Sequence, residues 1–114
     1  MRLQPSGAYA ANLLGLTEQV PAKIIFLTDG PSRKVVIGKQ VIVLKRTTPK
    51  NMAASGRISG LVIQALRYLG KVSVDSETIS KLKKRLSQKD KERLLKDISC
   101  APAWIGAIFR KMVK

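Results

Sequence analysis

A long stretch of positive charge without any carboxylate stands out in this sequence of 114 residues. Between Asp29 and Asp75 there are nine Lys and Arg side chains and no Asp or Glu. Protein surfaces normally intersperse both signs of charge. Lys and Arg side chains displace the counterions condensed on a nucleic-acid backbone, so this stretch predicts a phosphate-binding surface. The alternative is that these residues are only solvated and protect sheet edges and a helix face.

Eight of these basic residues form the predicted nucleic-acid-binding site. They are Arg33, Lys34, Lys39, Lys45, Arg46, Lys50, Arg57 and Arg67. Because alternate side chains of a strand point to opposite faces, Lys45 and Arg46 can share one surface only if the strand ends between them. A second basic cluster, from Lys81 to Arg93, is interleaved with acidic residues and indicates an ordinary exposed helix surface.

The composition excludes several kinds of catalytic site. The chain has no His and a single Cys, Cys100, which excludes an imidazole base, a Cys–His nucleophile pair, a Cys/His zinc site and an internal disulfide. A metal-dependent nuclease needs at least two converging carboxylates. Asp29 ends a predicted strand, but no second carboxylate follows it, and we expect Asp29 to form a turn with Gly30. We therefore expect no enzyme, no catalytic residue, no metal ion and no cofactor.

The overall charge also indicates an anionic partner. The chain carries 22 Lys and Arg against 7 Asp and Glu, a formal net charge of +15, and 45% of its residues are hydrophobic. That hydrophobic share is too high for a disordered basic tail. No apolar run reaches the roughly 18 to 20 residues that span a bilayer, and no signal peptide is evident. We expect a soluble, cytoplasmic protein without a membrane partner.

The first half of the chain predicts one short helix and a small sheet. Ser6 can cap a helix over residues 6–14, which Gly15 would end. Runs of β-branched and aromatic residues predict strands over 23–28, 33–37 and 40–45. Gly38 and Lys39 separate the last two strands and suit a type II′ turn, so these strands should pair antiparallel.

The second half predicts helices. The expected ranges are 56–69, 76–86, 88–98 and 102–112. Ser55, Asp75 and Ser87 suit the N-caps of the first three helices. The apolar residues of the first helix recur at helical spacing on one face. Its opposite, solvent face is expected to carry Arg57, Gln64, Arg67 and Lys71.

These elements predict a single α+β domain over residues 1–114. The expected architecture is a small antiparallel sheet of about three strands, preceded by one short helix and followed by a helical C-terminal half. No internal repeat and no linker divides the chain. Sequence patterns of this kind do not fix the order of the strands.

Several runs of the chain are similar to a known protein family. The most specific are Ser6-Gly7-Ala8-Tyr9-Ala10-Ala11-Asn12-Leu13-Leu14-Gly15-Leu16 and Phe26-Leu27-Thr28-Asp29-Gly30-Pro31-Ser32-Arg33. Gln19-Val20-Pro21-Ala22, Pro49-Lys50-Asn51-Met52-Ala53 and Arg57-Ile58-Ser59-Gly60-Leu61 look like parts of the same pattern. Together they resemble the C-terminal region of AbiEi-type antitoxins of bacterial type IV toxin–antitoxin and abortive-infection systems. The resemblance covers essentially the whole chain.

The resemblance implies a non-enzymatic antitoxin. Proteins of this type carry an N-terminal winged helix-turn-helix domain that binds operator DNA and represses its own operon, and a C-terminal domain that neutralises a nucleotidyltransferase toxin. This chain begins at Met1 beyond the winged helix, which implies a fragment or a stand-alone C-terminal domain. The expected partners are DNA, at an operator or non-specifically, and a cognate nucleotidyltransferase toxin, opposed by direct contact or functionally. Toxin neutralisation depends on the resemblance alone.

Three other functions remain open from the residues. The basic face could meet an acidic surface of a toxin without any nucleic acid. The chain could be a stand-alone basic DNA- or RNA-binding protein without a toxin partner, although it has few aromatic side chains for base stacking. A metal-dependent nuclease built on Asp29 is the least favoured of the three.

Overall fold

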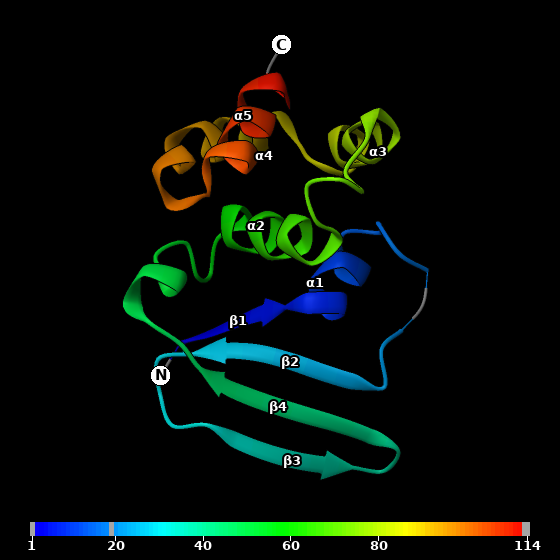
Figure 1. Ribbon diagram of the computed structural model, residues 1–114, viewed down its shortest axis with the longest axis vertical. Helices are drawn as coiled ribbons and strands as arrows, with labels where there is room; N and C mark the ends of the chain where they lie inside the picture. The colour runs from blue at the N-terminus through cyan, green and yellow to red at the C-terminus, as the bar shows by residue number, and fades with distance from the viewer. Residues whose placement is uncertain (1, 19, 113–114) are drawn as a thin grey trace.

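The structure is a computed structural model that describes residues 2–18 and 20–112; predictions that involve Met1, Gln19, Val113 or Lys114 lie outside the described residues. The described residues form an α+β fold with a helical C-terminal half, which confirms the predicted fold class (Figure 1). In chain order the elements are β1 (Leu3–Ser6), α1 (Gly7–Leu13), β2 (Lys23–Thr28), β3 (Arg33–Ile37), β4 (Gln40–Arg46), η1 (Pro49–Met52), α2 (Ile58–Leu69), α3 (Ser76–Arg85), α4 (Gln88–Lys96), η2 (Ile98–Cys100) and α5 (Ala103–Met112).

The sheet of the described residues is mixed and has four strands, which corrects the antiparallel sheet of about three strands. The strand order is β1-β2-β4-β3. β1 pairs antiparallel with β2, and β3 with β4, but β2 and β4 are parallel neighbours. The parallel pair forms because the chain passes from β2 to the outer strand β3 and then turns back between them. The sequence missed β1 because it is short and contains Pro5, which suits an edge strand.

The turn between β3 and β4 is the one predicted. Ile37 pairs with Gln40, so Gly38 and Lys39 form a two-residue loop. Gly38 has a φ of +61°, and among the described residues no residue other than glycine has a positive φ. This combination is what a type II′ turn requires, because only its first central residue is left-handed.

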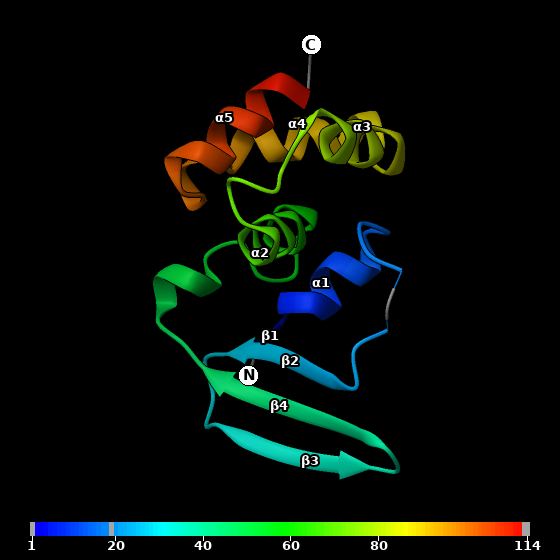
Figure 2. The same ribbon diagram turned by 45° about the vertical axis from the view of Figure 1, so that its right-hand side comes forward.

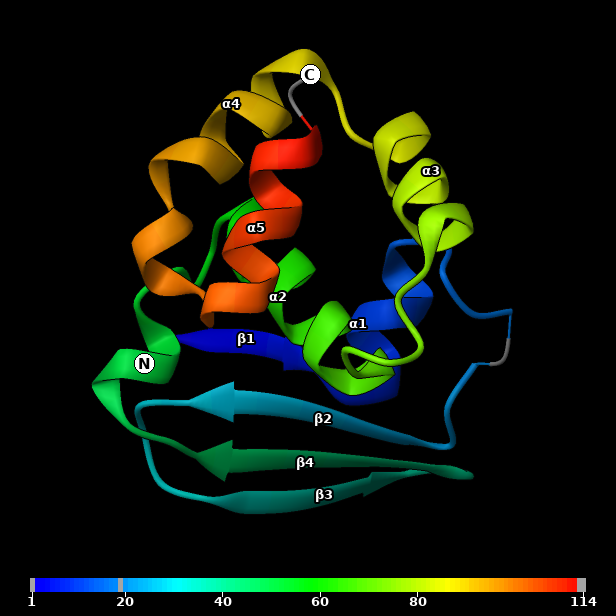
Figure 3. The same ribbon diagram turned by 45° about the horizontal axis from the view of Figure 1, so that its top comes forward.

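The helices gather on the β1 side of the sheet. Figures 1 and 2 show α1 and α2 beside β1, with α3, α4 and α5 beyond α2. The β3–β4 hairpin lies at the opposite end of the molecule, and no helix covers it in Figures 1, 2 and 3. All five residues of β3 are exposed. The hairpin is therefore an extension of the sheet rather than a part of the core.

Helix α2 lies at the centre of the core. Its Val62, Ala65 and Leu66 are fully buried, as are Leu82 of α3, Leu94 of α4 and Phe109 of α5. Because α1 and β1 pack on one side of α2 and the later helices on the other, its predicted solvent face is only partly exposed (Figure 2). Gln64 is buried, contrary to the prediction, and its Oε1 accepts a hydrogen bond of 3.1 Å from Ser6 Oγ. Arg67 and Lys71 are exposed as predicted.

The helix caps are partly as predicted. Asp75 accepts a hydrogen bond from the Thr78 backbone, and Ser87 and Asp90 form a reciprocal capping box, which confirms both N-caps. Ser55 is not a cap, since α2 begins at Ile58 and the buried Ser55 Oγ has no hydrogen-bond partner among the described residues. Ser6 precedes α1 without capping it, because its hydroxyl donates to Gln64.

The remaining ends of the predicted helices and strands agree with the structure within two residues. Within residues 2–18 and 20–112, none of the helices has the length and apolar character that crossing a membrane would require.

Candidate nucleic-acid interface

Four of the predicted residues surround one end of the β3–β4 hairpin. β3 begins with Arg33 and Lys34, and β4 ends with Lys45 and Arg46, so antiparallel pairing places the two pairs side by side. Lys34 lies opposite Val43 and Arg33 opposite Leu44. By strand alternation, Lys34 and Lys45 point to one face of the sheet, and Arg33 and Arg46 point to the other.

The strand does not end between Lys45 and Arg46, so these two side chains do not share a surface. The end of the hairpin is instead basic on both faces. Its four cationic side chains are exposed, and none has a carboxylate partner among the described residues. The Arg46 backbone N–H donates to Ser32 Oγ at 3.0 Å, which holds the loop before β3 against the end of β4. This arrangement presents free cations at one end of the two outermost strands on the β3 side of the four-stranded sheet, where they are open to an anionic partner.

Lys50 and Arg67 lie in the neighbouring elements η1 and α2. Both line a hollow of about 310 Å³ together with Asn51 and the η2 segment. Arg67 Nη1 donates to Asn51 Oδ1 at 3.4 Å, and Asn51 Nδ2 donates to Thr47 Oγ1 at 2.8 Å. Only two residues separate the end of β4 from η1, so Lys50 follows the basic end of the hairpin closely along the chain (Figure 1).

Lys39 is not part of this group. It lies in the turn at the far end of the hairpin, five ladder pairs away from Arg33. The structure thus brings together Arg33, Lys34, Lys45 and Arg46, places Lys50 and Arg67 in the adjoining elements, and leaves Lys39 apart. We call the six grouped residues the basic band; its members are Arg33, Lys34, Lys45, Arg46, Lys50 and Arg67.

Arg57 is distinct from the basic band because it has a carboxylate partner. Its Nε donates to Asp97 Oδ2 at 3.2 Å, and its Nη2 donates to Asp97 Oδ1 at 3.2 Å and to the Ala53 carbonyl at 2.9 Å. Arg93 Nε donates to the same Asp97 Oδ2 at 3.1 Å. The side chain of Asp97 is only 7% exposed. Two arginines therefore share one buried carboxylate, and they tie the start of α2 to the end of α4.

The surroundings of Asp97 keep its carboxylate charged. Burial alone would raise its pKa, but the pKa is lowered by the hydroxyl of Ser59 and by the guanidinium groups of Arg93 and Arg57. Ser59 is fully buried, and its single O–H can donate either to Asp97 or to the Arg93 carbonyl, whose oxygen lies 3.4 Å from Ser59 Oγ. We call Arg57, Asp97 and Arg93 the arginine–aspartate junction.

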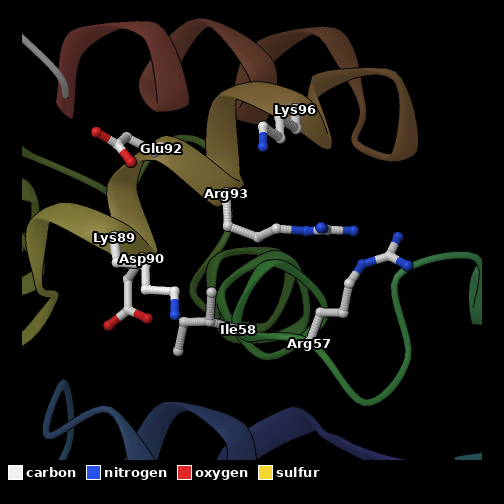
Figure 4. Close-up of a pocket in the computed structure, with 7 residues that line it drawn as sticks. All are labelled: Arg57, Ile58, Lys89, Asp90, Glu92, Arg93 and Lys96. Carbon is white, nitrogen blue, oxygen red and sulfur yellow. The ribbon is translucent and has the colours of Figure 1, made fainter.

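A hollow of about 440 Å³ lies beside this junction. It is lined by Arg57, Ile58, Lys89, Asp90, Glu92, Arg93 and Lys96 (Figure 4). The sequence interpretation misses this site, because it treats the Lys81–Arg93 cluster as an exposed helix surface. The Arg93–Asp97 spacing of four residues was available as a signal. The sequence gives no such signal for the Arg57–Asp97 pair, because 40 residues separate the two side chains along the chain.

Asp29 has no catalytic arrangement around it. It accepts hydrogen bonds from the Arg2 backbone N–H at 2.8 Å and from Arg2 Nε at 3.2 Å, which together lower its pKa. The chain bends at Asp29 and Gly30, but the Asp29 side chain does not make the turn as predicted, because its carboxylate binds Arg2 and the Gly30 N–H donates to Thr28 Oγ1 at 3.0 Å. Across the described ranges, no three His, Cys, Asp or Glu side chains gather as metal ligands would.

Comparison with known proteins gives one match. A model of the DUF6088 family, described as a family of unknown function, matches residues 1–94. No curated protein and no solved structure matches the chain.

Proposed function

Since the chain belongs to the DUF6088 family, whose function is unknown, we propose its function from its own residues and from its resemblance to AbiEi-type antitoxins. The proposal is a non-enzymatic antitoxin domain of a bacterial toxin–antitoxin system. It neutralises a nucleotidyltransferase toxin, and its basic band contributes nucleic-acid binding to transcriptional autoregulation. Its proposed location is the cytoplasm.

The main support for nucleic-acid binding is positive charge that no carboxylate among the described residues neutralises. Of the nine cations between Asp29 and Asp75, Arg57 alone has a carboxylate partner within the described part of the chain. The six members of the basic band are all exposed and lie on consecutive elements from β3 to α2. A phosphate backbone supplies anions for such exposed cations, and the counterions that it releases favour binding.

The resemblance supports the antitoxin part. The two most specific runs form α1 with the segment that follows it, and β2 with the loop that leads into β3. The second run ends at Arg33, so it also contains the start of the basic band.

A salt series with a labelled DNA duplex and an RNA hairpin tests the nucleic-acid part. For the Arg33→Ala/Lys34→Ala double variant we expect weaker binding to all sequences alike, with a salt slope smaller by about 2, one for each lost phosphate contact. The matched control is Lys81→Ala/Lys84→Ala, which removes the same charge from α3, away from the hairpin (Figure 1). Equal slopes for the two double variants would contradict a role for the hairpin.

Co-production with a nucleotidyltransferase toxin, followed by growth, tests the antitoxin part. Recovery of growth supports neutralisation, and recovery by the Arg33→Ala/Lys34→Ala variant would separate neutralisation from nucleic-acid binding. Nucleic-acid binding without recovery would favour a stand-alone DNA- or RNA-binding protein. Recovery of growth without any nucleic-acid binding would indicate that the basic band contacts an acidic surface of the toxin.

A further inference from the structure

We propose that the hollow beside the arginine–aspartate junction is an anion site that takes a phosphate group between Arg57, Arg93 and Lys96. This site goes beyond the proposed function, because it lies between α2 and α4 and shares no residue with the basic band. Its ligand is a terminal phosphate, either on a small molecule such as a nucleotide or at the end of a nucleic-acid strand.

The junction holds two like-charged groups side by side. The Nε atoms of Arg57 and Arg93 both lie within 3.2 Å of the same carboxylate oxygen, Oδ2 of Asp97. One buried carboxylate neutralises only one of the two guanidinium charges. The junction therefore keeps one excess positive charge at a fixed position, and Lys96 adds a second at the edge of the hollow.

Both arginines also keep unused donors. Arg57 commits its Nε and Nη2 to Asp97 and Ala53, while its Nη1 has no partner among the described residues. Arg93 commits only its Nε to a side chain, so both of its Nη atoms are free of protein partners in the same part of the chain. Guanidinium N–H groups match phosphate oxygens in geometry and charge. Because Asp97 and Ala53 already fix these side chains, little conformational entropy remains to be lost on binding.

The arrangement of the hollow separates Arg57, Arg93 and Lys96 from the two carboxylates that line it, whereas Lys89 lies on the side of Asp90. Figure 4 shows the guanidinium groups of Arg57 and Arg93 approaching each other at one end, with the Lys96 amine nearby. The carboxylates of Asp90 and Glu92 lie at the other end. Asp90 is also engaged locally, since it accepts a hydrogen bond of 3.1 Å from the Ser87 backbone in the capping box. A volume of about 440 Å³ leaves room for a phosphate and for part of the molecule that carries it.

The free donors select the kind of phosphate. At one end of the hollow Arg57, Arg93 and Lys96 bring three positive charges and Asp97 removes one, while Lys89, on the side of Asp90, adds one positive charge against the two carboxylates of the other end. A terminal phosphate monoester offers three free oxygens and up to two negative charges to the guanidinium and amine donors, whereas a backbone phosphodiester offers two free oxygens and a single charge. The site is therefore expected to prefer terminal phosphates over the internal phosphates of a strand.

Calorimetric titration of the whole chain with pyrophosphate at low salt tests the site. We expect one pyrophosphate per chain, and we expect Lys96→Gln to weaken its binding several-fold and Arg93→Gln to weaken it by at least about tenfold. Lys84→Gln is the matched control, because it removes one exposed charge from α3 outside the hollow, and it should change the affinity by less than about twofold.

A variant that keeps the fold and a comparison of ligands complete the test. Lys96 makes no hydrogen bond or ion pair within the described ranges, so Lys96→Gln keeps the fold even if Arg93→Gln does not. ATP and a 5′-phosphorylated oligonucleotide, beside its unphosphorylated form, distinguish a nucleotide from a strand end. The Arg33→Ala/Lys34→Ala variant should bind pyrophosphate normally, whether or not the chain binds DNA. Absence of pyrophosphate binding at millimolar concentration, or an equal loss in Lys84→Gln, would overturn the proposal.

Discussion

The β3–β4 hairpin and the arginine–aspartate junction place the same kind of side chain in two different settings. Arg33 and Arg46 extend from an uncovered sheet, and no carboxylate among the described residues contacts them. Arg57 and Arg93 are held by a carboxylate that is 7% exposed. The difference shows that the role of an arginine depends on whether the fold places a carboxylate beside it. The hairpin leaves its cations available, whereas the junction uses half of its positive charge to join two helices.

The two regions also differ in how they bury apolar surface. Val36 and Ile37 of the hairpin are 62% and 60% exposed, whereas Phe109 of α5 is completely buried. Burial of apolar surface is the main favourable term in folding. The stability of the chain is therefore expected to depend on the helical half, and the hairpin is expected to tolerate substitution.

The largest expected effect tests whether the helical half, rather than the hairpin, stabilises the fold. Phe109→Ala removes a fully buried ring and should lower the free energy of unfolding by about 3–5 kcal/mol, measured by urea denaturation. Val36→Ala on the exposed hairpin should cost less than about 1 kcal/mol. A cost for Val36→Ala close to that of Phe109→Ala would show that the hairpin is part of the stabilising core.

The next effect concerns the two kinds of ion pair. Asp97→Asn removes the charge that both junction arginines share and should lower the free energy of unfolding by roughly 1–3 kcal/mol. Asp29→Asn affects only the exposed pair with Arg2, and we expect a smaller loss in the same denaturation experiment. A larger loss of unfolding free energy for Asp29→Asn than for Asp97→Asn would show that the exposed ion pair stabilises the fold more than the buried one.

Two glycines allow a comparison between a tightly packed position, Gly60 in α2, and an open turn at Gly38. A Cβ at Gly60 would collide with the carbonyl of Ala54 and with the Gln4 side chain, so Gly60→Ala should cost about 1–3 kcal/mol. A Cβ at Gly38 meets no atom within 4 Å, but its φ of +61° is unfavourable for alanine, at a cost of about 1 kcal/mol. Thermal unfolding of both variants should show the larger decrease in Tm for Gly60→Ala.

The smallest expected effect is a pH dependence. The folded-state pKa of Asp97 is lowered, so the unfolded chain takes up a proton first as the pH falls. The stabilisation is thus complete well above about pH 4, the ordinary pKa range of an aspartate, and is lost as the pH falls through the lower folded-state value. Asp97→Asn should reduce this dependence without abolishing it, because the pKa values of Asp29 and Asp75 are lowered too. An unchanged pH profile in denaturation experiments would show that Asp97 contributes nothing to it.

The sequence predicts what depends on local chemistry. The hairpin turn at Gly38 and Lys39, the caps at Asp75 and Ser87, and the ranges of β2, β3 and β4 follow from neighbouring residues and agree with the structure. The strand order does not follow from neighbouring residues, because β4 enters between two strands that precede it in the chain. Local pattern also fails for Gln64, whose helical position indicates solvent but which packs against the β1–α1 segment.

The same limit applies to the candidate site. Alternation along the strands was enough to foresee that Lys45 and Arg46 would separate if the strand continued, and it does continue. The partner of Arg57 could not be foreseen, because Asp97 belongs to a helix end 40 residues later. Charge alone therefore identifies candidate cations, but only tertiary contacts show which of them are already neutralised.

The outer edge of β3 has a consequence for how the protein behaves at high concentration. Its backbone groups face no further strand within the described sheet, and its last three residues, Val35, Val36 and Ile37, are exposed hydrophobic residues. Such an edge is a template for pairing with another copy, and mutual repulsion between chains of net charge +15 opposes that pairing. Salt near 1 M shortens the range of this repulsion to about 3 Å, from about 10 Å at 0.1 M. Concentrated salt, which removes nucleic acid from basic proteins, should therefore promote aggregation of this one.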